Sequence, residues 1–188
     1  MSLVRRLGMA LLAAALVSLI APSVRADRAR VYFDCGKERR NAMVCLACNI
    51  YHEARNQSDP GQLSVAMVVL NRRMTPGYPQ DICEVVWDIR KDARTGEPVA
   101  HFSWTNDTLP DAVTEPRAWQ RAWTLARLAL LSHYGRAPHL ADPTHGALNY
   151  HSVNVSPYWR DGLEPTVRIG DHLFYRPRAK PEIAVAGR

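Results

Sequence analysis

The sequence lacks several patterns that would assign an enzyme to a chemical class. There is no GxSxG motif, the usual sign of a serine hydrolase with a nucleophile elbow, and no glycine-rich loop that would cradle phosphates. His52-Glu53 matches the opening of the zinc-binding motif HExxH, but Asn56 stands where the second histidine belongs. The chain has no internal repeat either, which excludes a solenoid. The function must therefore be sought outside these classes.

Charge of one sign is not in large excess. The chain holds 24 Lys and Arg against 18 Asp and Glu, a formal net charge of +6. Arg5, Arg6 and Arg25 lie in the N-terminal segment considered next, and without them 21 basic residues face 18 acidic ones, a net charge of +3. So small an excess does not predict nucleic acid as a partner.

Long hydrophobic runs are also missing. The longest, Met9 to Ala21, is shorter than the ~20 residues that a membrane-spanning helix needs. Two arginines precede this run and Val24-Arg25-Ala26 follows it, a pattern typical of an export signal. We expect residues 1–26 to be a signal peptide that is removed, which predicts an exported protein, periplasmic or secreted, without stable membrane insertion. The remaining ~160 residues suffice for one domain with a hydrophobic core.

Cysteine is scarce, with four residues that all follow the expected signal. In an exported chain, an even number of cysteines favours two disulfides, and three pairings are open. The Cys45-x-x-Cys48 spacing occurs without a second CxxC, so a zinc site is not expected. Helical spacing predicts that both thiols point away from the apolar stripe, toward segments that carry Cys35 and Cys83.

Hydrophobic periodicity predicts a mainly helical domain. The expected helices cover residues 41–56, 61–73, 82–87 and 116–135. The expected strands cover residues 99–104, 147–151 and 167–175. Asn41 is a suitable N-cap, and the helix over 61–73 is apolar nearly all round, which predicts a central position. Residues 88–97 are expected to form a polar loop.

One carboxylate lies close to an apolar helix face. The predicted first helix has an apolar stripe made of Met43, Leu46, Ala47, Ile50 and Ala54. At 100° per residue Glu53 falls on the margin of this stripe, where partial desolvation raises the pKa of a carboxyl group. Cleavage of a glycosidic bond needs such an acid, because the leaving oxygen must be protonated. The residues alone leave open that Glu53 only pairs with Arg55 or Arg72.

Several spaced blocks follow one another between residues 42 and 176. They are Cys45-Leu-Ala-Cys-Asn-Ile-Tyr-His-Glu-Ala-Arg55, Val65-Ala-Met-Val-Val-Leu-Asn-Arg72, His101-Phe-Ser-Trp104, Asn149-Tyr-His151, Pro157-Tyr-Trp159 and Ile169-Gly-Asp-His-Leu-Phe-Tyr-Arg176. In this order they resemble the cell wall hydrolase family that includes the SleB-type spore cortex-lytic enzymes. The resemblance implies an α+β fold, predominantly helical, with a single lysozyme-like catalytic domain and a small β element.

The resemblance also implies domain limits and a reaction. The catalytic domain would cover residues 41–176. The charged, irregular residues before it predict an extended lead-in at 27–40, and the Pro-rich basic residues after it predict a disordered tail at 177–188. Glu53 aligns with the general acid of lytic transglycosylase chemistry, which breaks the MurNAc–GlcNAc bond without water and leaves a 1,6-anhydromuramic acid end. Peptidoglycan glycan strands are the implied partner of a monomeric enzyme, with no cofactor and no metal.

The matched blocks supply candidate groove residues. The candidates for substrate binding are Asn71, Ser103, Tyr150, His151, Tyr158 and Trp159. Amide and hydroxyl groups can bond sugar hydroxyls, aromatic faces can stack on sugar rings, and His151 would orient a substrate group or Glu53. Two departures from the family pattern, His52 in place of an aromatic residue and His101 in place of a cysteine, mean that a disulfide scheme cannot be carried over.

Three alternatives stay open. A water-using muramidase would need a second carboxylate as base, for which the candidates are Asp59, Glu84, Asp88 and Asp107. A catalytically silent peptidoglycan-binding module would keep the groove and have no need of Glu53. A metal-dependent wall peptidase would use His145 and His151.

Overall fold

The computed structural model describes residues 33–179. The helices are α1 (Ala42–Ala54), α2 (Asp59–Met74), α3 (Ile82–Val86) and α4 (Pro116–His133). The strands are β1 (Phe33–Asp34), β2 (Ile89–Lys91), β3 (Pro98–Ala100), β4 (Ala112–Val113), β5 (Asn149–Ser152), β6 (Leu163–Ile169) and β7 (His172–Pro177). Short 3₁₀ helices are η1 (Cys35–Lys37), η2 (Ser103–Thr105) and η3 (Tyr158–Gly162). The predicted signal peptide at 1–26 lies outside the described residues, as do residues 27–32 of the expected lead-in and 180–188 of the expected tail.

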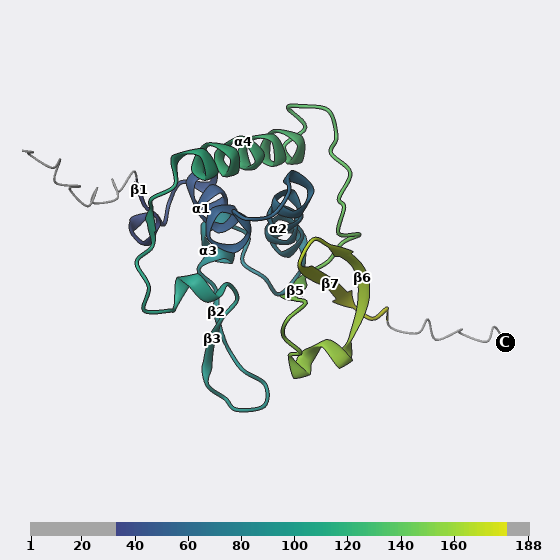
Figure 1. The fold of residues 1–188 in the computed structure, drawn as a ribbon. Coiled ribbons are helices and arrows are strands. Elements are labelled where there is room, and N and C mark those ends of the chain that lie inside the picture. The colour runs from purple at the N-terminus through teal and green to yellow at the C-terminus, as the bar shows by residue number, and fades with distance from the viewer. Residues whose placement is uncertain (1–32, 180–188) are drawn as a thin grey trace, which may run out of the picture.

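The predicted α+β class, predominantly helical, is confirmed. Helices α1 and α2 lie at the centre, α4 runs across them, and the three-stranded sheet lies to one side with the β2–β3 hairpin below (Figure 1). The sheet has the order β5-β7-β6 and is antiparallel throughout. Among residues 33–179, no helix is long and apolar enough to cross a membrane.

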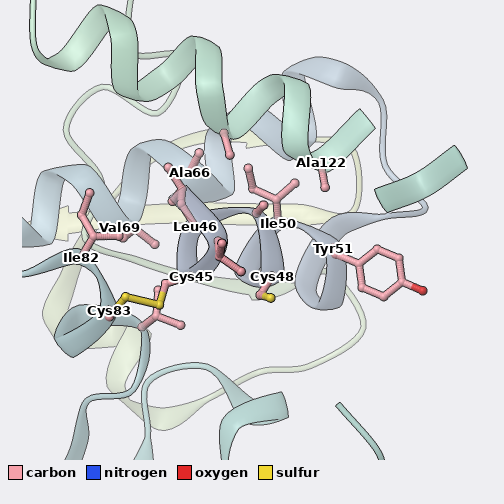
Figure 2. Packing of buried hydrophobic residues seen from close by; sticks show 14 of the residues in the cluster. Cys45, Leu46, Cys48, Ile50, Tyr51, Ala66, Val69, Ile82, Cys83 and Ala122 are labelled. Atoms are coloured by element: carbon pink, nitrogen blue, oxygen red, sulfur yellow. A yellow bond between two sulfur atoms is a disulfide. The ribbon is translucent and has the colours of Figure 1, made fainter. Parts of the chain in front are cut away.

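The core is built around two buried helices rather than one. Helix α2 is buried from Val65 to Leu70, which confirms the central position predicted for it. Helix α1 is buried just as continuously from Val44 to Tyr51, and its residues pack against α2 and α4 (Figure 2). Burial on all sides removes most of the apolar surface of both helices from water, which is the main stabilising contribution to a fold of this size.

Local signals explain where the helices begin. The Asn41 side chain accepts hydrogen bonds from the backbone N–H groups of Met43 and Val44, at 3.0 and 3.2 Å, and so caps α1 as predicted. Asp81 caps α3 in the same way. Helix α2 starts two residues earlier than expected, at Asp59, because Pro60 fits the first turn of a helix.

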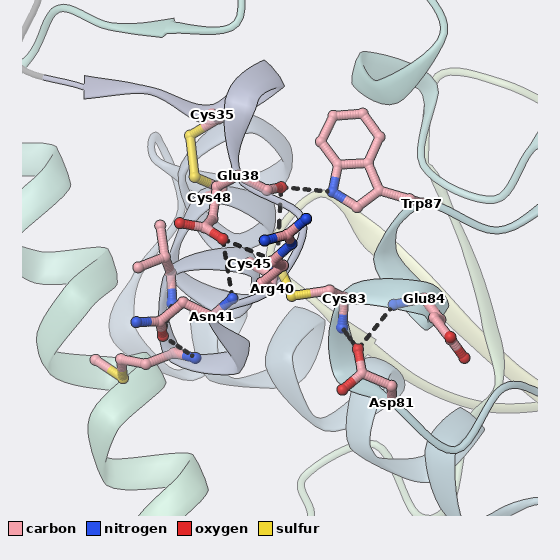
Figure 3. Close-up of a disulfide and its surroundings, with 12 residues drawn as sticks. Cys35, Glu38, Arg40, Asn41, Cys45, Cys48, Asp81, Cys83, Glu84 and Trp87 are labelled. Atoms are coloured by element: carbon pink, nitrogen blue, oxygen red, sulfur yellow. Dashed lines mark hydrogen bonds between the residues drawn. A yellow bond between two sulfur atoms is a disulfide. The ribbon is translucent and has the colours of Figure 1, made fainter.

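The cysteines form two disulfides, Cys35–Cys48 and Cys45–Cys83. The first ties η1 to α1 and the second ties α3 to α1 (Figure 3). The prediction of two disulfides is confirmed, and Cys45 and Cys48 reach the flanking segments that carry Cys83 and Cys35. Because these segments cover this side of α1, all four cysteines are buried in the main hydrophobic cluster.

The strand predictions were correct only in part. Of residues 99–104, the strand covers Pro98–Ala100 and a 3₁₀ turn begins at Ser103. The expected polar loop contains β2, which pairs with β3 as an exposed hairpin. Its residues alternate too weakly in polarity to reveal a strand, because neither face is deeply buried.

The third predicted strand is a hairpin. Strands β6 and β7 replace the single stretch 167–175, and Gly170, with φ of 57°, makes the turn between them. The disordered tail was expected to start at residue 177, but Pro177 is the last residue of β7 and pairs with Leu163. Backbone pairing therefore orders the chain to the end of this strand.

Candidate active site

Glu53 lies in the last turn of α1, and a residue of the three-stranded sheet holds its side chain in place. The Tyr150 hydroxyl of β5 donates a hydrogen bond of 2.8 Å to Glu53 Oε2. Tyr150 is fixed in turn by the buried ring of Phe174 on β7, at a centroid distance of 5.5 Å. The sheet thus sets the position of the carboxyl group that the helix carries.

Burial decides the protonation of this pair. It raises the pKa of Glu53 above its usual value, while the Tyr150 hydrogen bond and the charge of Arg72 work in the opposite direction. Burial also raises the pKa of Tyr150 well above its usual value, so the hydroxyl stays a donor at neutral pH. The arrangement favours a carboxyl group that can hold a proton and release it.

Neither arginine that could have neutralised Glu53 forms an ion pair with it. Arg55 pairs with Glu115 at 2.8 Å, outside α1. Arg72 donates from Nε to the carbonyl oxygen of Leu148, also at 2.8 Å. In the described part of the chain Glu53 has no salt bridge, so the interpretation that it only pairs with an arginine does not describe this site.

A groove of about 520 Å³ opens on one side of Glu53, and we call it the first groove. Its lining includes Glu53, Ser103, Trp104, Asp107 and Asp111. Burial raises the pKa of Asp111, and the nearby charge of Asp107 adds to the rise. The first groove therefore holds two further carboxyl groups and the predicted candidate Ser103.

A smaller groove of about 270 Å³, the second groove, lies between the β2–β3 hairpin, β5 and η3. Its lining includes Arg72, Lys91, Tyr150, Tyr158 and Trp159. Three of the predicted substrate-binding residues, Tyr150, Tyr158 and Trp159, thus come together here. Because Tyr150 also bonds Glu53, the acid lies at the point where the two grooves approach each other.

The residue next to the acid has a structural role that sequence analysis missed. The His52 ring stacks on Trp104 at a centroid distance of 4.5 Å, and Trp104 Nε1 donates to Asn49 Oδ1 at 3.0 Å. Burial lowers the pKa of His52 to about 4, so its ring is uncharged at neutral pH. This stack forms one wall of the first groove, and the family pattern of an aromatic residue at position 52 was the signal for it.

Two predicted binding residues are engaged elsewhere. Asn71 donates to Asp142 Oδ2 at 2.9 Å and to the Ala147 carbonyl oxygen at 3.1 Å, and it lines a separate cavity between α2 and α4. His151 bonds the Tyr175 hydroxyl at 3.0 Å and the Ser152 carbonyl oxygen at 2.8 Å. The residue that contacts Glu53 is Tyr150 and not His151.

The candidate bases are dispersed. Asp59 pairs with Arg121, Glu84 is exposed on α3, and Asp88 pairs with Arg90 at 2.7 Å. Of the four candidates, Asp107 alone lines the groove that holds Glu53, and Asp111 joins it without having been predicted. Over residues 33–179, no group of three or more His, Cys, Asp or Glu side chains has an arrangement that could hold a metal ion.

Comparison with known proteins places this architecture in a family. The sequence pattern of the family described as Cell Wall Hydrolase matches residues 56–175. The chain belongs to the cell wall hydrolase family. The matched range begins just after Glu53, so the place of this residue in the site rests on the geometry described above and on the flanking sequence block.

Two curated relatives of this cell wall hydrolase are spore cortex-lytic enzymes. The one from Bacillus subtilis is 30% identical over 136 residues, which cover 71% of this chain and 37% of that protein. The one from Halalkalibacterium halodurans is 28% identical over 135 residues, covering 71% and 34%. The chain therefore matches little more than a third of the length of these relatives.

A solved structure shares the fold. The catalytic domain of the germination-specific lytic transglycosylase SleB from Bacillus anthracis superposes with a TM-score of 0.51 at 22% identity. The match covers 74% of this cell wall hydrolase and 98% of that domain. The fold of the described residues is accordingly that of a SleB-type catalytic domain.

Proposed function

We propose that this cell wall hydrolase cleaves the glycan strands of peptidoglycan between MurNAc and GlcNAc, as a lytic transglycosylase with Glu53 as its catalytic acid. The observation that carries the proposal is the Glu53 carboxyl group, partly buried, free of ion pairs among the described residues and held by Tyr150 where two grooves approach. The names of the relatives, lytic transglycosylase and spore cortex-lytic enzyme, agree with it.

In the first step Glu53 acts as an acid. Its proton passes to the glycosidic oxygen while the bond from that oxygen to C1 of muramic acid breaks, and positive charge develops at C1. The GlcNAc part leaves with a new hydroxyl group. The raised pKa of Glu53 keeps the proton available for this transfer.

In the second step the same group acts as a base. The Glu53 carboxylate accepts the proton of the muramic acid 6-hydroxyl, and the hydroxyl oxygen forms a bond to C1. The product is a 1,6-anhydromuramic acid end, and Glu53 is protonated again. Tyr150 donates its hydrogen bond to the carboxylate between the two steps, which limits the cost of the charged form.

Other groove residues would hold the strand. Tyr158 and Trp159 offer aromatic faces for sugar rings in the second groove, and the Ser103 hydroxyl is available to sugar hydroxyls in the first. Asn71 and His151 would support the site indirectly, through the contacts that fix α2 and the sheet.

Hydrolysis is the second candidate reaction, because Asp107 and Asp111 line the same groove as Glu53. Either carboxylate, if placed opposite the reacting carbon, would activate a water molecule and give a reducing end. The products distinguish the two reactions.

We further propose that the protein is exported, to the periplasm or beyond, and acts as a monomer in wall remodelling through a catalytic domain at 41–176. Two disulfides in so short a chain support an oxidising compartment. The peptidoglycan substrate lies outside the cytoplasm, which agrees with this location.

The test is digestion of purified peptidoglycan by the oxidised protein beside its Glu53→Gln variant, with the fragments resolved by mass spectrometry. Fragments with 1,6-anhydromuramic acid ends, reduced about a thousandfold or more in rate by the substitution, support the proposal. Reducing ends would assign hydrolysis instead. Equal cleavage by both proteins would exclude Glu53 as the acid, and binding without cleavage by both would indicate a silent module.

A further inference from the structure

Arg72 is a buried cation at the edge of the second groove. The side chain projects from α2, is 4% exposed, and lines the second groove opposite the hairpin. Its Nε atom is bonded to the Leu148 carbonyl oxygen, but its Nη1 atom is buried without any hydrogen-bond partner within residues 33–179. A buried charged donor that lacks a partner carries a substantial free-energy cost.

The surroundings of Arg72 do not neutralise it. The nearest rings are Phe102 and Tyr78, at 4.8 and 5.8 Å from the guanidinium carbon. Asp88 is close enough to act on Arg72 but pairs with Arg90. Glu53 is the other acidic group nearby, and catalysis by the proposed mechanism begins with Glu53 protonated and uncharged.

The rim of the second groove adds a second cation. Lys91 on β2 is exposed and lines the groove, and it forms no ion pair in the part of the chain that the structure describes. The carboxylate of Asp92 is already occupied, since Oδ2 accepts from the Tyr158 hydroxyl at 2.6 Å and Oδ1 accepts from Thr95 and the Arg94 backbone. Asp92 keeps its negative charge, but the lining of the second groove holds three cations, Arg72, Arg90 and Lys91, against this one carboxylate.

Aromatic side chains border these cations. Tyr158 is 45% exposed and Trp159 is half-buried, and both line the second groove. A groove that combines aromatic faces with an excess of positive charge suits a sugar that carries an acid. Of the two sugars in peptidoglycan, muramic acid alone bears a carboxyl group, on its lactyl ether, where the peptide stem is also attached.

We propose that the second groove binds a carboxylate of a muramic acid residue, with Arg72 and Lys91 as its contacts. The proposal rests on the proposed function and narrows it, because it places muramic acid on the hairpin side of Glu53. The carboxylate is either that of a free lactyl group or that of a peptide stem. In both cases it supplies a negative charge close to the Arg72 guanidinium once Glu53 is protonated.

The test measures binding to the Glu53→Gln variant, which retains the grooves and does not cut its ligand. Three tetrasaccharides of alternating GlcNAc and MurNAc are compared by calorimetry: free lactyl acids, neutral lactyl methylamides, and lactyl groups extended by L-alanyl-D-isoglutamate. We expect an anionic form to bind about tenfold tighter than the methylamide. If the tetrasaccharide with free lactyl acids binds most tightly, the bound carboxylate is that of the lactyl group. If the form with the dipeptide binds most tightly, the bound carboxylate is that of the peptide stem.

Matched variants tie the preference to the groove. Lys91→Met should reduce the preference for the anionic form over the methylamide about threefold, and Arg72→Gln should abolish it. Lys37 is an exposed lysine on η1, and Lys37→Met should leave the preference unchanged. If circular dichroism shows that Arg72→Gln is unfolded, the ligand comparison and Lys91→Met decide alone.

The experiments distinguish failure of the carboxylate site from failure of the proposed function. Equal binding of acid, dipeptide and methylamide forms, in a protein whose unsubstituted form cleaves peptidoglycan, overturns the carboxylate site and leaves the proposed function standing. Binding of none of the three, together with intact peptidoglycan after digestion, overturns the proposed function and the carboxylate site with it.

Discussion

At the scale of single residues, the site depends on one contact between segments far apart in the chain. Glu53 and Tyr150 are separated by 97 positions, and their hydrogen bond joins the end of α1 to the first strand of the sheet. The tyrosine does two things at once: it holds the carboxyl group in place and stabilises its charged form. Its removal should therefore change the pH dependence of activity as well as the rate.

Tyr150→Phe should move the alkaline limit of activity upward. The hydrogen bond from Tyr150 lowers the pKa of Glu53, so without it the carboxyl group keeps its proton to higher pH. The rate should fall about tenfold to a hundredfold, because the carboxylate formed between the two steps loses a charge-assisted hydrogen bond. Initial rates of peptidoglycan solubilisation between pH 4 and 9 measure both effects.

Tyr175→Phe is the matched control. It also removes a hydroxyl group from the same sheet, but one that bonds His151 and does not contact Glu53. An unshifted alkaline limit in Tyr150→Phe, or the same shift in Tyr175→Phe, would contradict the role assigned to Tyr150.

The position of Glu53 beside the core could be predicted from sequence, and its contact with Tyr150 could not. Glu53 stands on the margin of an apolar helix stripe, which is a local property of α1. Tyr150 was expected to stack on sugar rings, and its contact with Glu53 depends on the register in which β5 pairs with β7. Such a register is set by packing across the whole domain and leaves no mark in the local sequence.

At the scale of elements, helices were predictable and the β hairpins were not. Asn41, Pro116 and Gly135 are local stop and start signals, and the helices they delimit appear where expected. Hairpin β2–β3 lies on the surface, so its sequence carries no alternation of polar and apolar residues. The pairing of the cysteines follows from how α1, α3 and η1 pack, which spacing alone left open.

The two disulfides should contribute unequally to stability. Cys45–Cys83 closes a loop of 38 residues and Cys35–Cys48 one of 13. By loop entropy, replacing the first pair by alanine should lower the free energy of unfolding by about 4 kcal/mol, and replacing the second by about 3 kcal/mol. Urea denaturation of the two double variants at pH 7 measures the difference. A larger loss for the Cys35–Cys48 pair would contradict this account.

A hydrogen bond joins the β2–β3 hairpin to the far side of the second groove. Tyr158 of η3 donates to Asp92 in the turn between β2 and β3, at 2.6 Å. Tyr158→Phe should release the hairpin, so that amide hydrogens of residues 89–100 exchange faster with deuterium, while global stability changes by less than about 0.5 kcal/mol.

Tyr134→Phe serves as its control, since Tyr134 is similarly exposed and ends α4 far from the hairpin. Exchange in the hairpin that is equally fast in both variants, or unchanged in Tyr158→Phe, would show that this hydrogen bond does not restrain the turn.

At the scale of the whole molecule, burial of Glu53 should be visible in stability. Burial raises the pKa of Glu53 above its usual value of 4.5, so the folded protein retains a proton that the unfolded chain releases. Stability contributed by this group is therefore full below the unfolded pKa, falls as pH rises toward the folded pKa, and stays lower above it. The residue proposed as the catalytic acid thus weakens the fold at neutral pH.

Glu53→Gln should accordingly raise the melting temperature at pH 7, and the gain should shrink toward zero near pH 4. Thermal melts of both proteins from pH 4 to 8 measure this, with Glu97→Gln at an exposed turn as a control without such a trend. A gain that stays constant over the whole range, or a loss at pH 7, would mean that the Glu53 charge is not penalised in the folded protein.

The same organisation explains the proposed reaction. Two helices form the core, the sheet fixes Tyr150 against the end of α1, and the grooves open on either side of the acid. The first groove adds carboxyl groups, and the second adds an excess of positive charge. A lytic transglycosylase and a muramidase built on the same site differ in the group that attacks C1. In the first it is the muramic acid 6-hydroxyl, which gives its proton to Glu53, and in the second it is water.

Whether water enters the product can be measured by digesting peptidoglycan in water enriched in oxygen-18 and analysing the soluble fragments by mass spectrometry. A lytic transglycosylase adds no water, so we expect 1,6-anhydromuramic acid ends that carry no oxygen-18. Reducing ends labelled with oxygen-18, or glycan strands left intact, would contradict this expectation.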